Sequence, residues 1–492
     1  MSYLDLLRLA APETIIVITA LLVLVTDLIS APQLETRFRF IIGGMIVIFG
    51  CAAAIAWMLI FPAHGSVGAG MLVADPLTQF VKVALLGLTI FTVLISMESN
   101  FTTHIGEYLA LILLATVGMM FLVSAEDILM IFVSLELTSL SLYILTAFNK
   151  RNLKSAEAAL KYFLFGGMAA AFTLFGLSLL YGLTGSTNLR EIAFALAGKG
   201  IDPLLVVAIV MTVIGFGFKV AAVPFHLWAP DAYEGAPTPS AAFIASGSKV
   251  ASFFIFAKVM LLGFAGAEGS GAWHNFASGW TPVIAVVAAL SMLVGNLTAI
   301  VQSSVKRLIA YSAIAHAGYM LLAVMSHDGQ AIASLVYYAI TYGLTTIGAF
   351  GVVAIVEDRA GDDQLSSFAG LSRRSPVISF CMFIFMLSLA GIPPLAGFFG
   401  KFYVFSAVIT SDPGLLWLVV FAIAMSAVSL YYYLQVLKKI YVAEVPAGSG
   451  EVKAPIISQV ALCILAGLVI LLGCAPGLML NCLQRAVAAA GF

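Results

Sequence analysis

The chain uses one short phrase twice: Gly215-Phe216-Gly217-Phe218-Lys219 and, further along, Gly397-Phe398-Phe399-Gly400-Lys401. Both phrases end in a lysine that lies within a long apolar stretch. Pro224 follows the first lysine, and Pro393 and Pro394 precede the second. Because proline removes a backbone donor and clashes with the preceding helical turn, we expect a broken helix beside each lysine. Charged side chains next to broken helices at membrane depth are costly, and they are typical of ion pathways.

The composition predicts an integral membrane protein. Of the 492 residues, 62% are hydrophobic and only 10% are charged, and the mean hydropathy is +1.10. Soluble domains carry about 25% charged residues, so this chain has no room for a soluble catalytic domain. The 43 glycines and 17 prolines suit packed and interrupted membrane helices.

Apolar windows of about 20 residues predict an all-α polytopic fold with about fourteen transmembrane helices. The expected spans are 12–30, 40–61, 77–97, 107–124, 127–148, 157–184, 203–228, 239–263, 280–301, 306–326, 329–357, 376–410, 414–441 and 457–480. The first stretch is too long for a removable signal peptide and lacks the small-residue cleavage pattern, so we expect it to stay as an anchor.

The repeated phrase suggests internal symmetry. Spans four to eight and nine to thirteen form two blocks of five helices, and an odd number inverts the second block relative to the first. Span seven then corresponds to span twelve, and these two spans carry the phrase and the prolines. The expected organisation is an N-terminal three-helix segment at 1–106, a first repeat at 107–263, a second, inverted repeat at 280–441 and a C-terminal helix at 442–492.

Charges in the connections predict the orientation. The connections after odd-numbered spans hold most of the basic residues, which are Arg37, Arg39, Lys150, Arg151, Lys154, Lys306, Arg307, Arg359, Arg373, Arg374, Lys438, Lys439 and Lys453. The other connections hold only Arg190 and Lys199. By the positive-inside rule the first group is cytoplasmic, so both termini are expected on the outer side of the membrane. Arg8 and Arg485 argue mildly against this orientation.

A short list of ionisable groups lies inside the spans, and it consists of Lys82, Glu136, Lys161, Lys219, His226, Lys249, Lys258 and Lys401, with His316 beside them. Lys82 and Lys258 lie near span ends, where a flexible stem reaches the interface, so we expect a structural role for both. Lys161 follows Glu157 by four residues, and a salt bridge one turn apart explains it as well as a functional role does.

Glu136 and Lys249 are the deepest of these groups. Glu136 lies in the middle of its span, so it must be neutral, paired or facing an internal aqueous cavity. A neutral acid bonded to nearby hydroxyls is the structural alternative, and we favour the functional one. Lys249 has small neighbours, which indicate close helix packing and an inward direction. Lys258 comes nine residues later and falls on the opposite helix face at about 100° per residue, so it cannot share a path with Lys249.

Two histidines are candidates for proton transfer. His226 follows Pro224 by two residues, and it either bonds a carbonyl that the proline frees or relays protons; we favour the relay. For His316, core packing and relay are equally open. Buried lysine, histidine and carboxylate groups can pass protons through internal waters, because moving a carboxylate changes how strongly a lysine holds its proton.

No cofactor signature is present in the sequence. The five cysteines are scattered, without the C-x-x-C spacing of a metal or redox site, and they are Cys51, Cys381, Cys463, Cys474 and Cys482. There is also no G-x-G-x-x-G after a strand, no P-loop and no iron–sulfur cysteine set. Any nucleotide or redox centre that the function needs is therefore expected on other chains.

Three runs resemble the antiporter-like membrane subunits of respiratory complex I, the proton-translocating NADH:quinone oxidoreductase. They are KVAAVPFHLWAPDAYEGAPTP at 219–239, VKRLIAYS at 305–312 and AGIPPLAGF at 390–398, and the likeness covers nearly the whole chain.

Within that family the chain is most similar to the bacterial N-type subunits. Lys401 stands where the M type has glutamate, and the chain ends near its fourteenth span without the lateral helix of the L type. The contexts of 235–239 and 132–137 are also similar to the N type.

The resemblance implies roles for the candidate residues. Glu136 and Lys219 would form a pair whose separation changes during coupling, and Lys249 would be the central group. Lys161 and His226 would assist transfer, and Lys401 would lead to the exit. NADH, FMN, iron–sulfur clusters and quinone would be bound by other subunits, so this chain would belong to an enzyme without redox catalysis of its own.

The resemblance also implies a setting. The chain would lie in the bacterial inner membrane with periplasmic termini, and it would contact lipid and other complex I membrane subunits. These include the M-type antiporter-like subunit and small membrane subunits, with no nucleic-acid partner. The alternatives are an Mrp-like cation/proton antiporter subunit, which would use the same buried groups, and a purely structural membrane scaffold.

Overall fold

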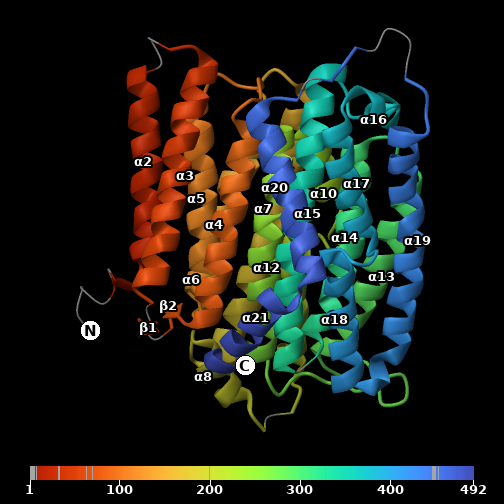
Figure 1. Ribbon diagram of the computed structural model, residues 1–492. Coiled ribbons are helices and arrows are strands. Elements are labelled where there is room, and N and C mark those ends of the chain that lie inside the picture. The colour runs from red at the N-terminus through yellow and green to blue at the C-terminus, as the bar shows by residue number, and fades with distance from the viewer. Residues whose placement is uncertain are drawn as a thin grey trace.

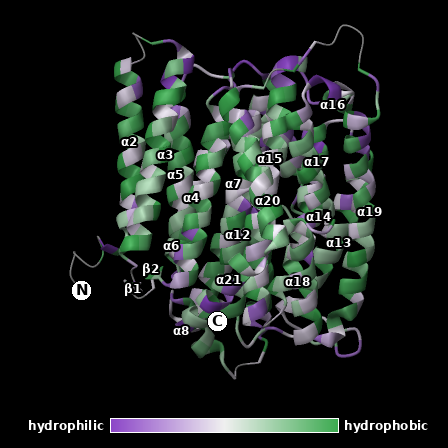
Figure 2. Ribbon diagram, in the orientation of Figure 1, coloured by the Kyte–Doolittle hydropathy of each residue, from purple (hydrophilic) through white to green (hydrophobic). Residues whose placement is uncertain are grey.

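The protein is a bundle of long, roughly parallel helices with short connections at two opposite ends (Figure 1). The computed structural model describes residues 6, 8–30, 34–62, 64–68, 70–198, 200–326, 328–445, 450–452 and 454–491. Lys199 and Lys453, which entered the orientation argument, lie outside these ranges. Hydrophobic residues dominate the helix bodies, and hydrophilic residues gather at the two ends (Figure 2). Within the described ranges, twelve helices are long and apolar enough to cross a membrane, so the chain is a multi-pass membrane protein.

The helices follow one another in chain order with few other elements. The first part contains α2 (Ala11–Ser30), α3 (Thr36–Ile60), the hairpin strands β1 (Gly65–Val67) and β2 (Leu72–Ala74), α4 (Pro76–Ser96), α5 (Ile105–Ser124), α6 (Ile128–Thr146), α7 (Leu153–Thr184), α8 (Leu189–Leu196), α9 (Pro203–Lys219), α10 (Trp228–Gly235), α11 (Thr238–Ala245), α12 (Gly247–Lys258) and the π-turn η1 (Val259–Gly263). The strands pair antiparallel, with Gly65 opposite Ala74.

The second part of the chain is built in the same way. It contains α13 (Trp280–Ile300), α14 (Val305–Val324), α15 (Gly329–Ala360), the short turns η2 (Leu365–Phe368) and α16 (Leu371–Arg374), α17 (Pro376–Ala390), α18 (Ala396–Ser411), η3 (Pro413–Leu415), α19 (Leu416–Tyr441), α20 (Ile456–Cys474) and α21 (Gly477–Ala490). The last predicted span, 457–480, is shorter in the structure, because Pro476 cannot continue a helix interior and separates α20 from α21.

Polar side chains fix several helix starts. Asp75 accepts from the Thr78 backbone N–H and Thr78 reaches back to Asp75, a complete capping box at the start of α4. Asp127 accepts from two backbone N–H groups at the start of α6. At the other end, Gly185 takes the left-handed conformation that ends α7. These signals account for the connections between long apolar helices.

Three helical segments in the interior are interrupted. Residues 220–227 separate α9 from α10 and contain Pro224, and residues 391–395 separate α17 from α18 and contain Pro393 and Pro394. The peptide bonds before Pro224 and Pro394 are cis. The third interruption is at Ser246, between α11 and α12, and no proline marks it. It was not predicted.

Burial differs strongly from helix to helix. In α15 and in the segment Thr238–Gly263, 94% of the most apolar window is buried, and in α14 the share is 89%. In α2 and α19 it is 28%, and these two helices lie at opposite edges of the bundle (Figure 1). The centre of the molecule is therefore the junction of α11–α12, α14 and α15.

Candidate functional site

The first interruption places Lys219 against α6. Its ammonium donates a hydrogen bond to the Ser139 hydroxyl. Ser139 is three residues after Glu136 on α6. Glu136 is half-buried and close enough to Lys219 for an electrostatic interaction, but no ion pair joins them in the described part of the chain. The Glu136 Oε1 atom is buried without a hydrogen-bond partner among the described residues. The expected pair is therefore adjacent but separated, with Ser139 holding the lysine.

The second lysine lies in the enclosed centre. Lys249 is in the first turn of α12, directly after the interruption at Ser246, and is 2% exposed. Its ammonium donates a hydrogen bond of 2.6 Å to the carbonyl oxygen of Ala313 on α14. The same ammonium lies 5.7 Å from the centre of the Tyr342 ring on α15. Lys249 thus meets the two other central helices at one point.

His316 stands between Lys249 and the second phrase. Its Nδ1 atom is 2.7 Å from the Tyr338 hydroxyl and its Nε2 atom is 3.1 Å from the Tyr433 hydroxyl. The imidazole and Tyr342 ring centres are 5.0 Å apart. His316 also interacts electrostatically with both Lys249 and Lys401. The sequence did not decide between core packing and proton relay for His316. The structure places it between the buried lysines Lys249 and Lys401.

Lys401 completes the row. Its ammonium donates to the carbonyl oxygens of Leu389 and Ala390, each at 3.1 Å, and to the Ser426 hydroxyl at 2.9 Å. The two carbonyls belong to the last turn of α17, where a helix leaves its carbonyl groups unpaired and carries partial negative charge. The Tyr319 ring lies 5.1 Å away. The interruption before α18 thus supplies the oxygen ligands of the lysine.

The other two predicted site residues do not join this row directly. Lys161 pairs with Glu157 at 2.7 Å and with Asp231 at 2.8 Å, and its side chain is 41% exposed. His226 lies in the first interruption, and its Nδ1 atom is buried without a hydrogen-bond partner among the described residues. Both residues flank α10 rather than the central junction.

A set of ion pairs fastens α10 to its neighbours. Arg307 on α14 donates to Asp231 and Glu234, both at 2.9 Å. Lys161 on α7 shares Asp231, and Lys154 on α7 reaches Glu234 at 3.0 Å. The helix beyond the first interruption is therefore tied to α7 on one side and to α14 on the other.

The prediction that Lys82 and Lys258 extend to the membrane interface is wrong. Their side chains are 3% and 1% exposed. Lys82 pairs with Glu13 on α2 at 2.7 Å, and Lys258 pairs with Glu126 at 3.2 Å. A buried carboxylate from a distant part of the chain gives each lysine a closer partner than water, which spacing along one helix cannot reveal.

The described residues hold no cluster of three or more His, Cys, Asp or Glu side chains placed to bind a metal ion. All five cysteines are free. What the site offers chemically is a succession of basic nitrogens, tyrosine hydroxyls and backbone carbonyls inside a membrane bundle. Such groups accept, hold and pass protons.

Residues 125–426 match the family described as NADH:quinone oxidoreductase/Mrp antiporter, TM. The chain is 52% identical to NADH-quinone oxidoreductase subunit N 2 of Acidobacterium capsulatum, over 98% of this chain and 99% of that protein. It is 43% identical to NADH-quinone oxidoreductase subunit N of Desulforamulus reducens, over 83% of both chains.

Two solved structures share the fold. One is a chain of respiratory complex I from Thermus thermophilus with bound aureothin, with a TM-score of 0.79, 32% identity and coverage of 96% of this chain and 98% of that one. The other is a chain of the Mrp complex from Dietzia sp., with a TM-score of 0.81, 19% identity and coverage of 98% and 97%. At that identity the second likeness concerns the fold alone.

Proposed function

Because the chain belongs to the NADH:quinone oxidoreductase/Mrp antiporter transmembrane family, we propose that it is an N-type, proton-translocating subunit in the membrane arm of NADH:quinone oxidoreductase. NADH oxidation, the FMN and iron–sulfur centres and quinone reduction belong to other subunits of the assembly. Its partners are the other membrane subunits, the M-type antiporter-like subunit and the small membrane subunits among them, together with the bilayer.

The row of Lys249, His316 and Lys401 carries this proposal, because Tyr342 lies beside the first two residues and Tyr319 beside the last two. Each member is buried, and each is hydrogen-bonded to carbonyl or hydroxyl oxygens rather than to a carboxylate. Hydrogen bonds of ordinary length link the imidazole to Tyr338 and Tyr433, so a proton can reach or leave either ring nitrogen through a hydroxyl. Ionisable groups buried in a membrane protein are costly, and they usually mark a pathway for ions or protons.

Lys219 and Glu136 act as a switch beside the row. When the Glu136 carboxylate approaches Lys219, it favours the protonated lysine; when it moves away, the proton is released toward Lys249. Ser139 positions the ammonium for this exchange. Lys161 and His226 assist transfer beside α10, and Lys401 passes the proton toward the exit side.

The architecture supports a proton pathway that opens alternately to the two sides of the membrane. Counting each interrupted segment as one crossing gives fourteen spans, with inverted five-helix repeats at 107–263 and 280–441 after the three-helix segment 1–106. The start of α2 and helix α21 lie at the same end of the bundle (Figure 1), as an even number of crossings requires. We place that end in the periplasm and the basic connections in the cytoplasm of the bacterial inner membrane.

The test replaces Lys249 with Met and Glu136 with Gln, each in the intact oxidoreductase in membrane vesicles. We expect NADH-driven proton pumping and the coupled quinone reduction to fall by about tenfold or more, because one transfer group is lost. The matched control is Lys150→Gln, which neutralises an exposed lysine. Normal pumping in both variants, with a normally assembled enzyme, would contradict the proposal.

A second candidate is an Mrp-like cation/proton antiporter subunit, favoured by the shared fold of the Mrp chain. Purification separates the two functions. Recovery of the chain with NADH-oxidising and quinone-binding subunits supports the oxidoreductase. Recovery in a complex of membrane subunits alone, with cation/proton exchange and no NADH oxidation, supports the antiporter.

A further inference from the structure

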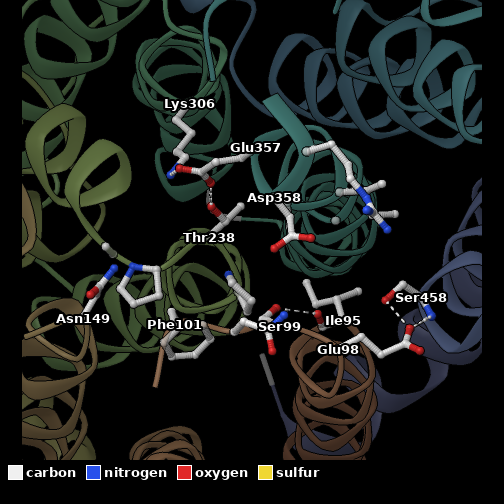
Figure 3. Close-up of a pocket in the computed structure, with 18 of the residues that line it drawn as sticks. Ile95, Glu98, Ser99, Phe101, Asn149, Thr238, Lys306, Glu357, Asp358 and Ser458 are labelled. Carbon is white, nitrogen blue, oxygen red and sulfur yellow. Dashed lines mark hydrogen bonds and ion pairs between the residues drawn. The ribbon is translucent and has the colours of Figure 1, made fainter. Parts of the chain in front are cut away.

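A cavity of about 290 Å³ opens at the end of the bundle that carries the basic connections. Figure 3 shows Lys306, Glu357 and Thr238 pointing toward one another at one side of it, with Asp358 and Glu98 at the other. Its wall includes Gly235, the last residue of α10, and the linker of Ala236 and Pro237 that leads to α11. The cavity therefore lies where α10, α11, α14 and α15 converge.

Glu357 is the carboxylate that links this cavity to the interior. Its side chain is 33% exposed, and it accepts a hydrogen bond of 2.7 Å from Lys306, whose side chain is only 4% exposed. Thr238, the first residue of α11, donates its hydroxyl to the same carboxylate. One face of Glu357 thus meets the cavity, while the other is held by buried groups.

The three helices that hold Glu357 are also the helices that surround Lys249. Thr238 begins the segment that carries Lys249, and Lys306 is seven residues before Ala313, the hydrogen-bond acceptor of Lys249. Seven residues correspond to about 10 Å of helix. Glu357 is on α15, which carries Tyr342 beside Lys249. The cavity floor is thus one end of the junction whose centre is Lys249.

Buried hydroxyl groups lie between the two ends of this junction. Tyr233 on α10 is 0% exposed and packs against Phe350, which is between Thr346 and Glu357 on α15. The Tyr233 hydroxyl is buried without a hydrogen-bond partner among the described residues, and the buried hydroxyls of Tyr342 and Thr346, one turn apart on α15, have no hydrogen-bond partner among them except each other. A buried hydroxyl without a partner costs about 1 to 3 kcal/mol, so these groups are suited to bind internal waters along the route.

We infer that Glu357 is the group that takes up protons from the aqueous phase, and that this cavity is the entrance of the row that leads to Lys249. The inference rests on the proposed function. A proton from cavity water binds the Glu357 carboxylate, which removes the negative charge that faces Lys306. The Lys306 ammonium, now without its counter-ion, favours onward loss of that proton, through waters held by the buried hydroxyls, to neutral Lys249, and the carboxylate is restored. Lys306 and Thr238 are positioning residues in this step.

The first test compares Glu357→Gln with Glu357→Asp and with Asp358→Asn in the intact oxidoreductase. Gln keeps the shape of the side chain but cannot exchange a proton, so we expect NADH-driven proton uptake from the cytoplasmic side to fall by about tenfold. Asp retains the carboxylate and should recover most of the rate. Asp358 is an exposed neighbour in the same cavity, and Asp358→Asn should be close to normal.

A double variant separates proton uptake from charge balance. Glu357→Gln alone leaves the Lys306 ammonium without a carboxylate partner, whereas Lys306→Met with Glu357→Gln removes both charges. If Glu357 serves only to neutralise Lys306, the double variant recovers pumping, and the inference is overturned. If Glu357 takes up protons, pumping stays low although assembly recovers.

A labelling experiment acts on the already assembled protein. Ser99→Cys places a thiol on the cavity wall, and Lys150→Cys places one on the same end outside it. A membrane-impermeant, negatively charged thiosulfonate added to inside-out vesicles should slow pumping in the first variant and leave the second unchanged. Equal pumping rates before and after labelling of Ser99→Cys would contradict the inference that this cavity is the proton entrance. If Lys249→Met abolishes pumping while the Glu357 and Ser99 variants are normal, the proposed function stands and only this inference fails.

Discussion

Lys249 on α12 donates a hydrogen bond of 2.6 Å to the carbonyl oxygen of Ala313 on α14. The acceptor is three residues before His316, so the buried ammonium contacts the same helical turn that carries the imidazole. Helix α14, which carries His316, therefore links Lys249 at one end of the row to the imidazole in its middle. Changes at this turn should affect transfer without touching either interrupted proline segment.

The first prediction concerns His316. His316→Gln preserves hydrogen bonding to Tyr338 and Tyr433 but removes a group that can carry a proton, so pumping should fall by about tenfold while assembly stays normal. His104→Gln is the control, because His104 is exposed at a connection. Pumping is measured in membrane vesicles with NADH as the electron donor. A normal rate in His316→Gln would assign the imidazole to core packing.

The second prediction concerns the glycine that follows α17. Gly391 has a φ of +84°, and a Cβ atom there would lie 3.2 Å from Cδ and 3.3 Å from Nζ of Lys401. Gly391→Ala combines backbone strain of about 1 to 2 kcal/mol with pressure on the lysine, so pumping and thermal stability should both decrease. Gly467→Ala on α20 is the control, since nothing lies within 4 Å of its added methyl group. Equal behaviour of the two variants would contradict this account.

The third prediction concerns the buried pair between α2 and α4. Lys82→Met leaves the Glu13 carboxylate, which is 1% exposed, without its cation. Removing one partner of a buried pair costs about 3 to 5 kcal/mol, so less assembled protein and a lower unfolding temperature are expected. Glu13→Gln combined with Lys82→Met removes both charges and should restore most of the loss. Thermal unfolding of the purified enzyme measures it, and a double variant as unstable as Lys82→Met would refute the pairing argument.

The fourth prediction concerns the acid stability of the loop before α6. Burial alone would raise the pKa of Glu126, but the charge of Lys258 and the hydrogen bond from Arg190 outweigh it and leave the pKa below its ordinary 4.5. The folded protein then binds fewer protons here than the unfolded chain, so the stabilisation is complete above the unfolded pKa. It is lost as the pH falls through the lowered value.

Unfolding temperatures measured from pH 7 down to about pH 3 test this dependence, because the loss begins near the unfolded pKa and continues below it. The wild-type protein should lose stability more steeply than Glu126→Gln at the acid end, while Glu126→Gln should be less stable at neutral pH. Glu191→Gln, at an exposed carboxylate of the same region, should follow the wild-type curve. Parallel curves for wild type and Glu126→Gln would show that the ion pair is not responsible.

Local chemistry explains which parts of the fold could be predicted. Apolar runs and prolines act within a few residues, so the membrane helices and the interruptions near Lys219 and Lys401 could be expected from the sequence. The interruption at Ser246 has no proline, and only serine and glycine beside Lys249 hinted at it. It lies in the segment Thr238–Gly263, one of the two most buried of the candidate membrane spans.

Partners that are distant in the chain explain what could not be predicted. His316 gains its place from tyrosines on α15 and α19, and Lys82 from a glutamate on α2. A single sequence shows that such residues are buried but not which groups they meet. The carboxylates along α10 and Glu357 were not among the candidate groups, although their ion pairs hold one end of the central helices together.

The bonding of the row also limits how many protons it can hold. In the described part of the chain, Lys249 and Lys401 bind carbonyl and hydroxyl oxygens, without an ion pair, and both interact with His316 between them. Like charges in a low-dielectric interior repel strongly, so full occupancy of all three sites is disfavoured. Under the proposed function we therefore expect the row to hold fewer protons than it has sites, because a proton on one site disfavours a proton on the next. We expect a proton to enter such a row only as another leaves.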